Sequence, residues 1–177
     1  MNYFTIPEIC IATENDIPAL NALLNSAYRG EASRKGWTTE AHLIAGETRT
    51  DENDLRGVIR KPGSVILKYT NEINQLIGCV NLQKHGDRLY LGMFSVSPEA
   101  QGAGIGKKIL LAAEQHALNV DSKSIYMHVI SLRTDIIEWY TRHGYVDSGN
   151  SKPFMEDALT GKHLQPLEFM VLEKFLS

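Results

Sequence analysis

Residues 91–108 read LGMFSVSPEAQGAGIGKK, and this stretch decides how the chain is interpreted. The apolar run up to Val96 is typical of a strand, and a short polar loop follows it. Gly102, Gly104 and Gly106 then stand at alternate positions where a helix begins. The N-terminus of a helix carries unpaired N–H groups and a partial positive charge, which suit a phosphate. Glycines allow a ligand to approach the backbone closely, because they have no Cβ.

Two lysines, Lys107 and Lys108, lie in the first turn of this expected helix. A cation at that position is unfavourable by a few tenths to about 1 kcal/mol, because the helix dipole already makes that end positive. A bound anion would remove the conflict, although both side chains could instead extend into water. The lysines leave these two explanations open.

Three known kinds of phosphate-binding loop can be compared with this stretch. A P-loop needs a second glycine five residues after the first, where this chain has Lys107. A dinucleotide fingerprint needs G-x-G-x-x-G directly after the strand and an acidic residue about 20 positions later. Here the spacing is G-x-G-x-G, the loop is longer, and the strand at residues 125–129 ends without an acid. The dinucleotide fingerprint is therefore weak, and the third kind is the pyrophosphate loop of coenzyme A.

The hydrophobic periodicity and the turn residues predict an alternation of helices and strands. We expect strands near residues 9–12, 65–67, 75–82, 88–96, 124–129, 145–146 and 167–172. We expect helices ending at Tyr28, from Thr38 or Thr39 through Glu47, from Thr50 to about Lys61, over 102–118 and over 134–143. Residues 148–166 are predicted to be a long polar connection. Three antiparallel strands in the middle and helices around them indicate a mixed α/β domain.

Two signatures resemble those of a known family. Residues 96–106 follow the pattern V-x-P-x-x-Q-x-x-G-x-G and resemble motif A of the GNAT acetyltransferases, V-x-P-x-x-[QR]-x-x-G-x-[GA]. Residues 139–145, WYTRHGY, resemble the family's second signature, a helical Tyr followed four residues later by Gly and an aromatic. The resemblance implies a single N-acetyltransferase domain over residues 1–177. It also implies a mixed, mostly antiparallel twisted sheet of about seven strands, flanked by helices on both faces.

The resemblance further implies that acetyl-CoA is the acetyl donor. The strand ending at Val96 should splay from the strand ending at Val129 and leave a cleft for pantetheine. The backbones of Phe94 and Val96 would pair with the pantetheine amides, and an N–H near Val96 would polarise the acetyl carbonyl. The residues assigned to the donor are Phe94, Val96, Gln101, Gly102, Ala103, Gly104, Ile105, Gly106 and Lys107.

Tyr140 is the residue that the resemblance marks as the catalytic acid, which would protonate the departing thiolate. It shares a helical face with Ile136 and Ile137, so packing in the core is the alternative. The family often has Asn at the position of Arg133, and we assign this arginine no role. The amine also needs a base, but the strand up to Val96 offers no carboxylate or imidazole. His128 on the neighbouring strand is a candidate, although a lone strand histidine is more often structural.

In the family, the acceptor site is formed by the first helical pair and a late loop. An aromatic side chain with a carboxylate would suit a cationic amine. The residues of this chain in those regions are Tyr28, Arg29, Glu31, Trp37, Glu40 and Phe154, and ordinary loop residues are the alternative interpretation.

Composition limits the other function classes. The chain has 177 residues, 43% of them hydrophobic and 22% charged, as expected for one globular domain. The net charge of −3 gives no electrostatic case for nucleic acid or a membrane as partner. No apolar run approaches the ~18 residues of a membrane span. Cys10 and Cys79 form no disulfide or metal pattern, so we expect no metal and a cytoplasmic setting.

The sequence thus predicts an N-acetyltransferase that moves the acetyl group of acetyl-CoA to a primary amine of a small molecule or peptide. The alternative is a non-catalytic acyl-CoA-binding module, which the missing strand carboxylate favours and Tyr140 disfavours. A third function, acetylation of charged tRNA, is disfavoured by the acidic composition. The resemblance also allows a homodimer.

Overall fold

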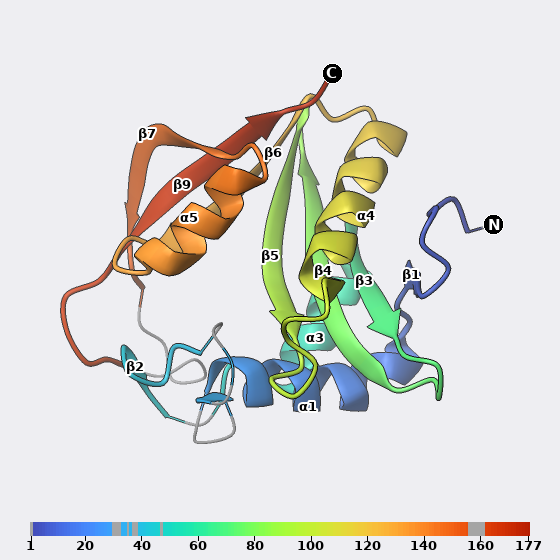
Figure 1. The fold of residues 1–177 in the computed structure, drawn as a ribbon, viewed down its shortest axis with the longest axis horizontal. Helices are drawn as coiled ribbons and strands as arrows, with labels where there is room; N and C mark the ends of the chain where they lie inside the picture. Colours follow the sequence, from blue (N-terminus) through green and yellow to red (C-terminus); the bar gives the residue numbers. More distant parts are fainter. Residues whose placement is uncertain (1, 30–32, 35, 37–38, 47, 156–161) are drawn as a thin grey trace.

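The computed structural model describes residues 2–29, 33–34, 36, 39–46, 48–155 and 162–177. In these residues seven strands form one sheet (Figure 1). Their spatial order is β1 (Ile9–Ile11), β3 (Ser64–Thr70), β4 (Leu76–His85), β5 (Arg88–Val96), β6 (Ser124–Ile130), β9 (Glu168–Phe175) and β7 (Val146–Pro153). Each neighbouring pair is antiparallel except β5 and β6, which run parallel. The predicted mixed, mostly antiparallel sheet is confirmed.

Helices cover both faces of the sheet, as predicted. They are α1 (Ile17–Tyr28), α3 (Glu52–Arg60), α4 (Ile105–Asn119) and α5 (Thr134–Arg142), with a short 3₁₀ turn, η1 (Glu14–Asp16), before α1. Ile66 of β3 packs in the core cluster of α1 and α3, whereas its neighbour Leu67 packs in that of α4 and α5. Because successive strand residues point to opposite faces, the two helix pairs lie on opposite sides of the sheet.

The buried stripe of α1 follows the spacing seen in the sequence. Leu20, Leu23, Leu24 and Ala27 recur at intervals of three and four and are all buried. Full burial stabilises a leucine by about 1.5–3 kcal/mol, so this stripe fixes α1 against the sheet. The C-terminal end of α1 at Tyr28 is thereby held close to β5.

Strands β5 and β6 pair over a short length only. Their register joins Arg88 to Ser124, Leu89 to Ile125 and Tyr90 to Tyr126, and no further pair follows. Beyond Tyr90 the two strands separate, so the predicted splaying is confirmed (Figure 1). In the same part of β5, Met93 has a φ of 52° and the register with β4 shifts between Cys79 and Asn81. Such a bulge bends a strand and changes the direction of its side chains.

Two predictions about local structure were wrong. The helix expected from Thr38 or Thr39 through Glu47 is not formed in described residues 39–46, which contain a turn and the short strand β2 (Ile44–Ala45). Strand β2 pairs with β8 (Lys162–His163) from far along the chain. The segment expected to be a polar connection over 148–166 also contains strands. Its first residues, up to Pro153, belong to β7, and β8 lies further along the chain. Strand β7 is an exposed edge strand, so it shows no hydrophobic alternation that a sequence could reveal.

Candidate active site

The glycine-rich turn between β5 and α4 is built for close approach of a ligand. Gly102 has a φ of 89° and Gly104, the N-cap of α4, a φ of 76°. Both angles lie in the left-handed region that other residues adopt only at a cost. The first helical bond runs from the Lys108 N–H to the Gly104 carbonyl, at 3.2 Å. The N–H groups that precede it have no intrahelical acceptor and face the helix N-terminus.

A cavity of about 290 Å³ adjoins this turn. Its lining comprises Phe94, Val96, Ala100, Gln101, Gly102, Gly104, Ile105, Gly106, Lys107 and Trp139. Eight of the nine residues assigned to the donor therefore lie together, and Ala103 is on the turn but outside this lining. Of the two lysines, Lys107 lines the cavity, while the Lys108 ammonium lies 3.8 Å from a Glu8 carboxylate oxygen. The lining fits an anionic ligand with an apolar arm.

Side chains hold the carbonyl groups at the end of β5. The Tyr28 hydroxyl donates to the Phe94 carbonyl, and the Gln101 amide donates to the Val96 carbonyl at 3.0 Å. A carbonyl oxygen has two lone pairs, so each can accept one more bond. Gln101 thus fastens the loop to the strand end, a role that its position in the motif did not reveal.

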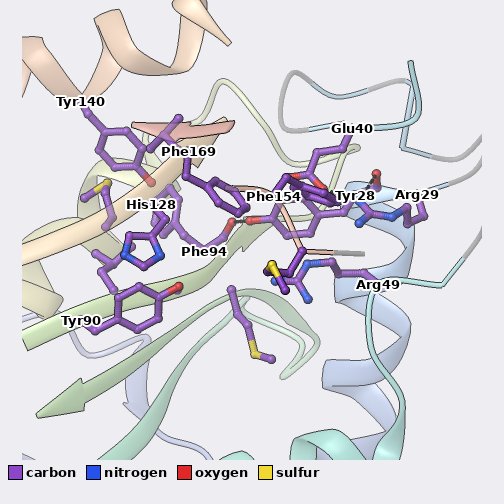
Figure 2. Close-up of a pocket in the computed structure, with 16 residues that line it drawn as sticks. Tyr28, Arg29, Glu40, Arg49, Tyr90, Phe94, His128, Tyr140, Phe154 and Phe169 are labelled. Atoms are coloured by element: carbon purple, nitrogen blue, oxygen red, sulfur yellow. Dashed lines mark hydrogen bonds and ion pairs between the residues drawn. The ribbon is translucent and has the colours of Figure 1, made fainter. Parts of the chain in front are cut away.

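Tyr140 lines a second cavity, of about 240 Å³ (Figure 2). Only 5% of the residue is exposed, and burial raises the pKa of its hydroxyl, which therefore stays protonated near neutral pH. Its ring packs against Phe94 and Tyr145, with centroids 6.2 and 5.7 Å away. Both the catalytic and the packing interpretation of Tyr140 are thus compatible with its surroundings.

His128 lines the same cavity from β6, beside Tyr140 and Tyr90 (Figure 2). Its Nε2 atom is buried and has no hydrogen-bond partner among the described residues. Burial lowers the pKa of the imidazole, and the charges of Lys152 and Arg88 lower it further. A buried polar atom without a partner is uncommon in proteins, and a neutral imidazole can accept a proton.

Four of the six predicted acceptor residues, Tyr28, Arg29, Glu40 and Phe154, line this cavity. Trp37 and Glu31 lie outside the described residues. Glu40 is not an unpaired carboxylate, because it forms an ion pair with the buried Arg29. Lining residues that the sequence did not single out include Arg49, Tyr90 and Phe169. No local motif marks them, and the fold alone brings them to the site.

Arg133 neither lies in solvent nor reaches the glycine-rich turn. It is 6% exposed, and its guanidinium bonds both carboxylate oxygens of Asp135, at 3.1 and 3.0 Å, and the Thr39 carbonyl. The residue therefore ties the start of α5 to the segment after α1.

Comparison with known proteins identifies the family. A model described as the acetyltransferase (GNAT) family matches residues 19–145. The chain belongs to the GNAT acetyltransferase family. No curated protein sequence matches the chain. The family uses acetyl-CoA, which agrees with the cavity beside the glycine-rich turn.

Solved GNAT structures share the fold. The ribosomal-protein-S18-alanine N-acetyltransferase from Escherichia coli is 13% identical, with a TM-score of 0.71 over 96% of this chain and 93% of that one. The ribosomal-protein-alanine N-acetyltransferase from Brucella melitensis is 19% identical, with a TM-score of 0.70 over 95% of this chain and 99% of that one. A candidate streptothricin acetyltransferase from Bacillus anthracis, in complex with acetyl coenzyme A, is 20% identical. Its TM-score is 0.57 over 68% of this chain and 67% of that one.

Within the described part of the chain, no group of three His, Cys, Asp or Glu side chains is arranged to hold a metal ion. No described helix is both long and apolar enough to cross a membrane.

Proposed function

We propose that this GNAT domain is an N-acetyltransferase that transfers the acetyl group of acetyl-CoA to a primary amine in a ternary complex. The observation that carries the proposal is the pair of cavities on either side of Phe94, which lines both. One adjoins the glycine-rich turn and the other contains Tyr140 and His128. A donor and an acceptor could therefore meet beside β5 without leaving the protein.

Each side of the reaction has a residue suited to it. Acetyl-CoA supplies an activated thioester. The amine nitrogen forms the new C–N bond to the acetyl carbon, and the C–S bond breaks. His128, neutral and with its Nε2 unpaired, takes a proton from the ammonium, so that the nitrogen lone pair becomes available. Tyr140, kept protonated by burial, gives its proton to the leaving thiolate. The amine's second proton then restores the tyrosine.

The alternative, a CoA-binding module without catalysis, rested on the absence of a base on β5. The unpaired His128 on β6 supplies a candidate base from the neighbouring strand, which weakens that argument. The cavity around Tyr140 is also not needed for binding the nucleotide. Both observations favour the transferase.

The test combines binding and turnover in the same samples. Acetyl-CoA at about 100 times its Kd should stabilise the native state by about 2.7 kcal/mol, which raises Tm by about 5–10 °C for a domain of this size. ADP, which lacks pantetheine, is the control ligand and should give a smaller shift. Release of free thiol over a panel of amines then measures transfer. A shift without thiol release for any amine would support the binding module, and no shift would refute the donor site.

A further inference from the structure

The acceptor cavity contains a positive charge that no described side chain neutralises. Its lining includes two arginines, Arg29 and Arg49, and a single carboxylate, Glu40. Glu40 pairs with Arg29. The Arg49 guanidinium has no carboxylate partner among the residues that the structure describes, and its contact is with the Tyr28 ring, 5.7 Å from the centroid. With His128 neutral, the described lining carries a net charge of about +1.

Arg49 is also held in place. The side chain of Asn25, on α1, accepts hydrogen bonds from the backbone N–H groups of Arg49 and Thr50 and donates to the Thr50 carbonyl at 3.1 Å. Helix α1 is itself fixed by its buried leucines. The backbone that carries the Arg49 side chain is thus fastened to α1 by hydrogen bonds.

The reacting groups and the free charge lie at different ends of the cavity. Figure 2 shows Tyr140, His128 and Tyr90 together at one end, and Arg49 with Tyr28, Arg29 and Glu40 at the other. Between them the wall is apolar and includes Phe154 and Phe169. An acceptor that fills this space would have its amine at the first end and a group of opposite charge to Arg49 at the second.

On the basis of the proposed function, we infer that the acceptor is a small zwitterion. It has a primary amine that is acetylated and an anionic group, a carboxylate or phosphonate, that binds Arg49. A planar guanidinium binds such oxyanions through two parallel hydrogen bonds, which a neutral amide cannot match. The cavity of about 240 Å³ is below the ~300–1,000 Å³ of ordinary ligand sites, so the acceptor group that it holds is about as small as a free amino acid.

The experiment compares acceptors that differ only in their charge. Amino acids, aminophosphonates and ω-amino acids of increasing length are each paired with the corresponding primary amide or uncharged amine. We expect a preference of about 10- to 100-fold in kcat/KM for the anionic member of the best pair, because a charged hydrogen bond is replaced by a neutral contact. The ω-amino acid series should show an optimum length, which reports the span between the two ends.

Substitutions at position 49 test the assignment. Arg49→Gln should lower kcat/KM for the anionic acceptor about 10- to 100-fold more than for its uncharged partner and so remove the preference, while Arg49→Lys should restore part of that preference. Arg49→Glu should favour diamines. Arg56→Gln is the matched control, since Arg56 lies on α3 outside the cavity lining and should keep the wild-type preference. Circular dichroism and acetyl-CoA binding verify that each variant is folded.

The outcomes separate this inference from the function on which it rests. Equal turnover of charged and uncharged amines, or an Arg49→Gln variant that slows both equally, would overturn the inference while leaving the transferase intact. Faster turnover of peptides with neutral N-terminal residues than of any free amino acid would also overturn it. If no amine releases thiol although acetyl-CoA binds, the proposed function itself fails.

Discussion

The donor site can be tested at Gly104 by adding a charge without adding a steric clash. A Cβ at this position would meet no atom within 4 Å, so both Gly104→Glu and Gly104→Gln fit the turn. Both share the cost of a side chain at a φ of 76°, about 1–2 kcal/mol, which lowers Tm by about 2–8 °C. The two variants have the same size and differ only in charge, so the glutamine isolates the electrostatic effect.

The charge should affect the protein and the complex in opposite directions. A carboxylate at the N-cap of α4 stabilises the free protein by about 0.3–1 kcal/mol relative to glutamine, because it complements the helix dipole. A bound pyrophosphate would instead be repelled. At roughly 6 Å and an effective dielectric constant of about 20–80, one charge pair costs about 1–3 kcal/mol, or about a five- to a hundredfold loss of affinity.

Calorimetric titration with CoA and thermal unfolding without it measure the two effects separately. We expect Gly104→Glu to have the higher Tm and the much weaker binding of the pair. Equal CoA affinity in the two variants would refute the assignment of the pyrophosphate to this turn. A lower Tm for the glutamate would refute the argument from the helix dipole.

The remaining predictions concern the two residues proposed for proton transfer. Tyr140→Phe keeps the ring that packs against Phe94 and Tyr145, so kcat should fall by about 100-fold or more while CoA affinity stays unchanged; an unaltered kcat would leave Tyr140 a packing residue. Burial lowers the pKa of His128 below its ordinary value of about 6.5, so the wild-type enzyme should keep its base down to below pH 6.5 and lose it as pH falls further. The ratio of wild-type to His128→Gln kcat/KM cancels the titration of the amine itself. That ratio should be constant above pH 6.5 and decline on the acid side, and a ratio near one at every pH would exclude His128 as the base.

Local chemistry explains which parts of the site could be predicted from the sequence. The glycine-rich turn is formed by its own backbone, so the spacing of Gly102, Gly104 and Gly106 was sufficient to predict a tight turn at the start of a helix. Tyr140 was predicted because its helix carries a recognisable signature. The stripe of α1 is local in the same sense, because its spacing of three and four is present in the sequence itself.

Long-range contacts explain what could not be predicted. Arg49 reaches the cavity because Asn25, 24 residues earlier, binds its backbone, and no sequence pattern encodes that contact. Strand β2 depends on a partner more than 100 residues away, so the capping residues near Thr39 predicted a helix instead. Thr39 in fact bonds the hydroxyl of Ser33 and, through its carbonyl, Arg133. Local propensity was overridden there by tertiary pairing.

The early end of the pairing between β5 and β6 explains where the proposed reaction would take place. Past Tyr90, the edge of β5 that faces β6 is not paired with another strand. A donor and an acceptor could therefore both approach β5 along this edge. Phe94 lies in that stretch and is the one described residue that lines the donor cavity, the acceptor cavity and the small cavity of about 90 Å³ between Tyr140 and Arg133. Its carbonyl is held by Tyr28, which itself lines the acceptor cavity and stacks beneath Arg49. The residue that recognises the anion is thus connected through two contacts to the strand at which the acetyl group would be transferred, and substitutions at Tyr28 should disturb both recognition and turnover.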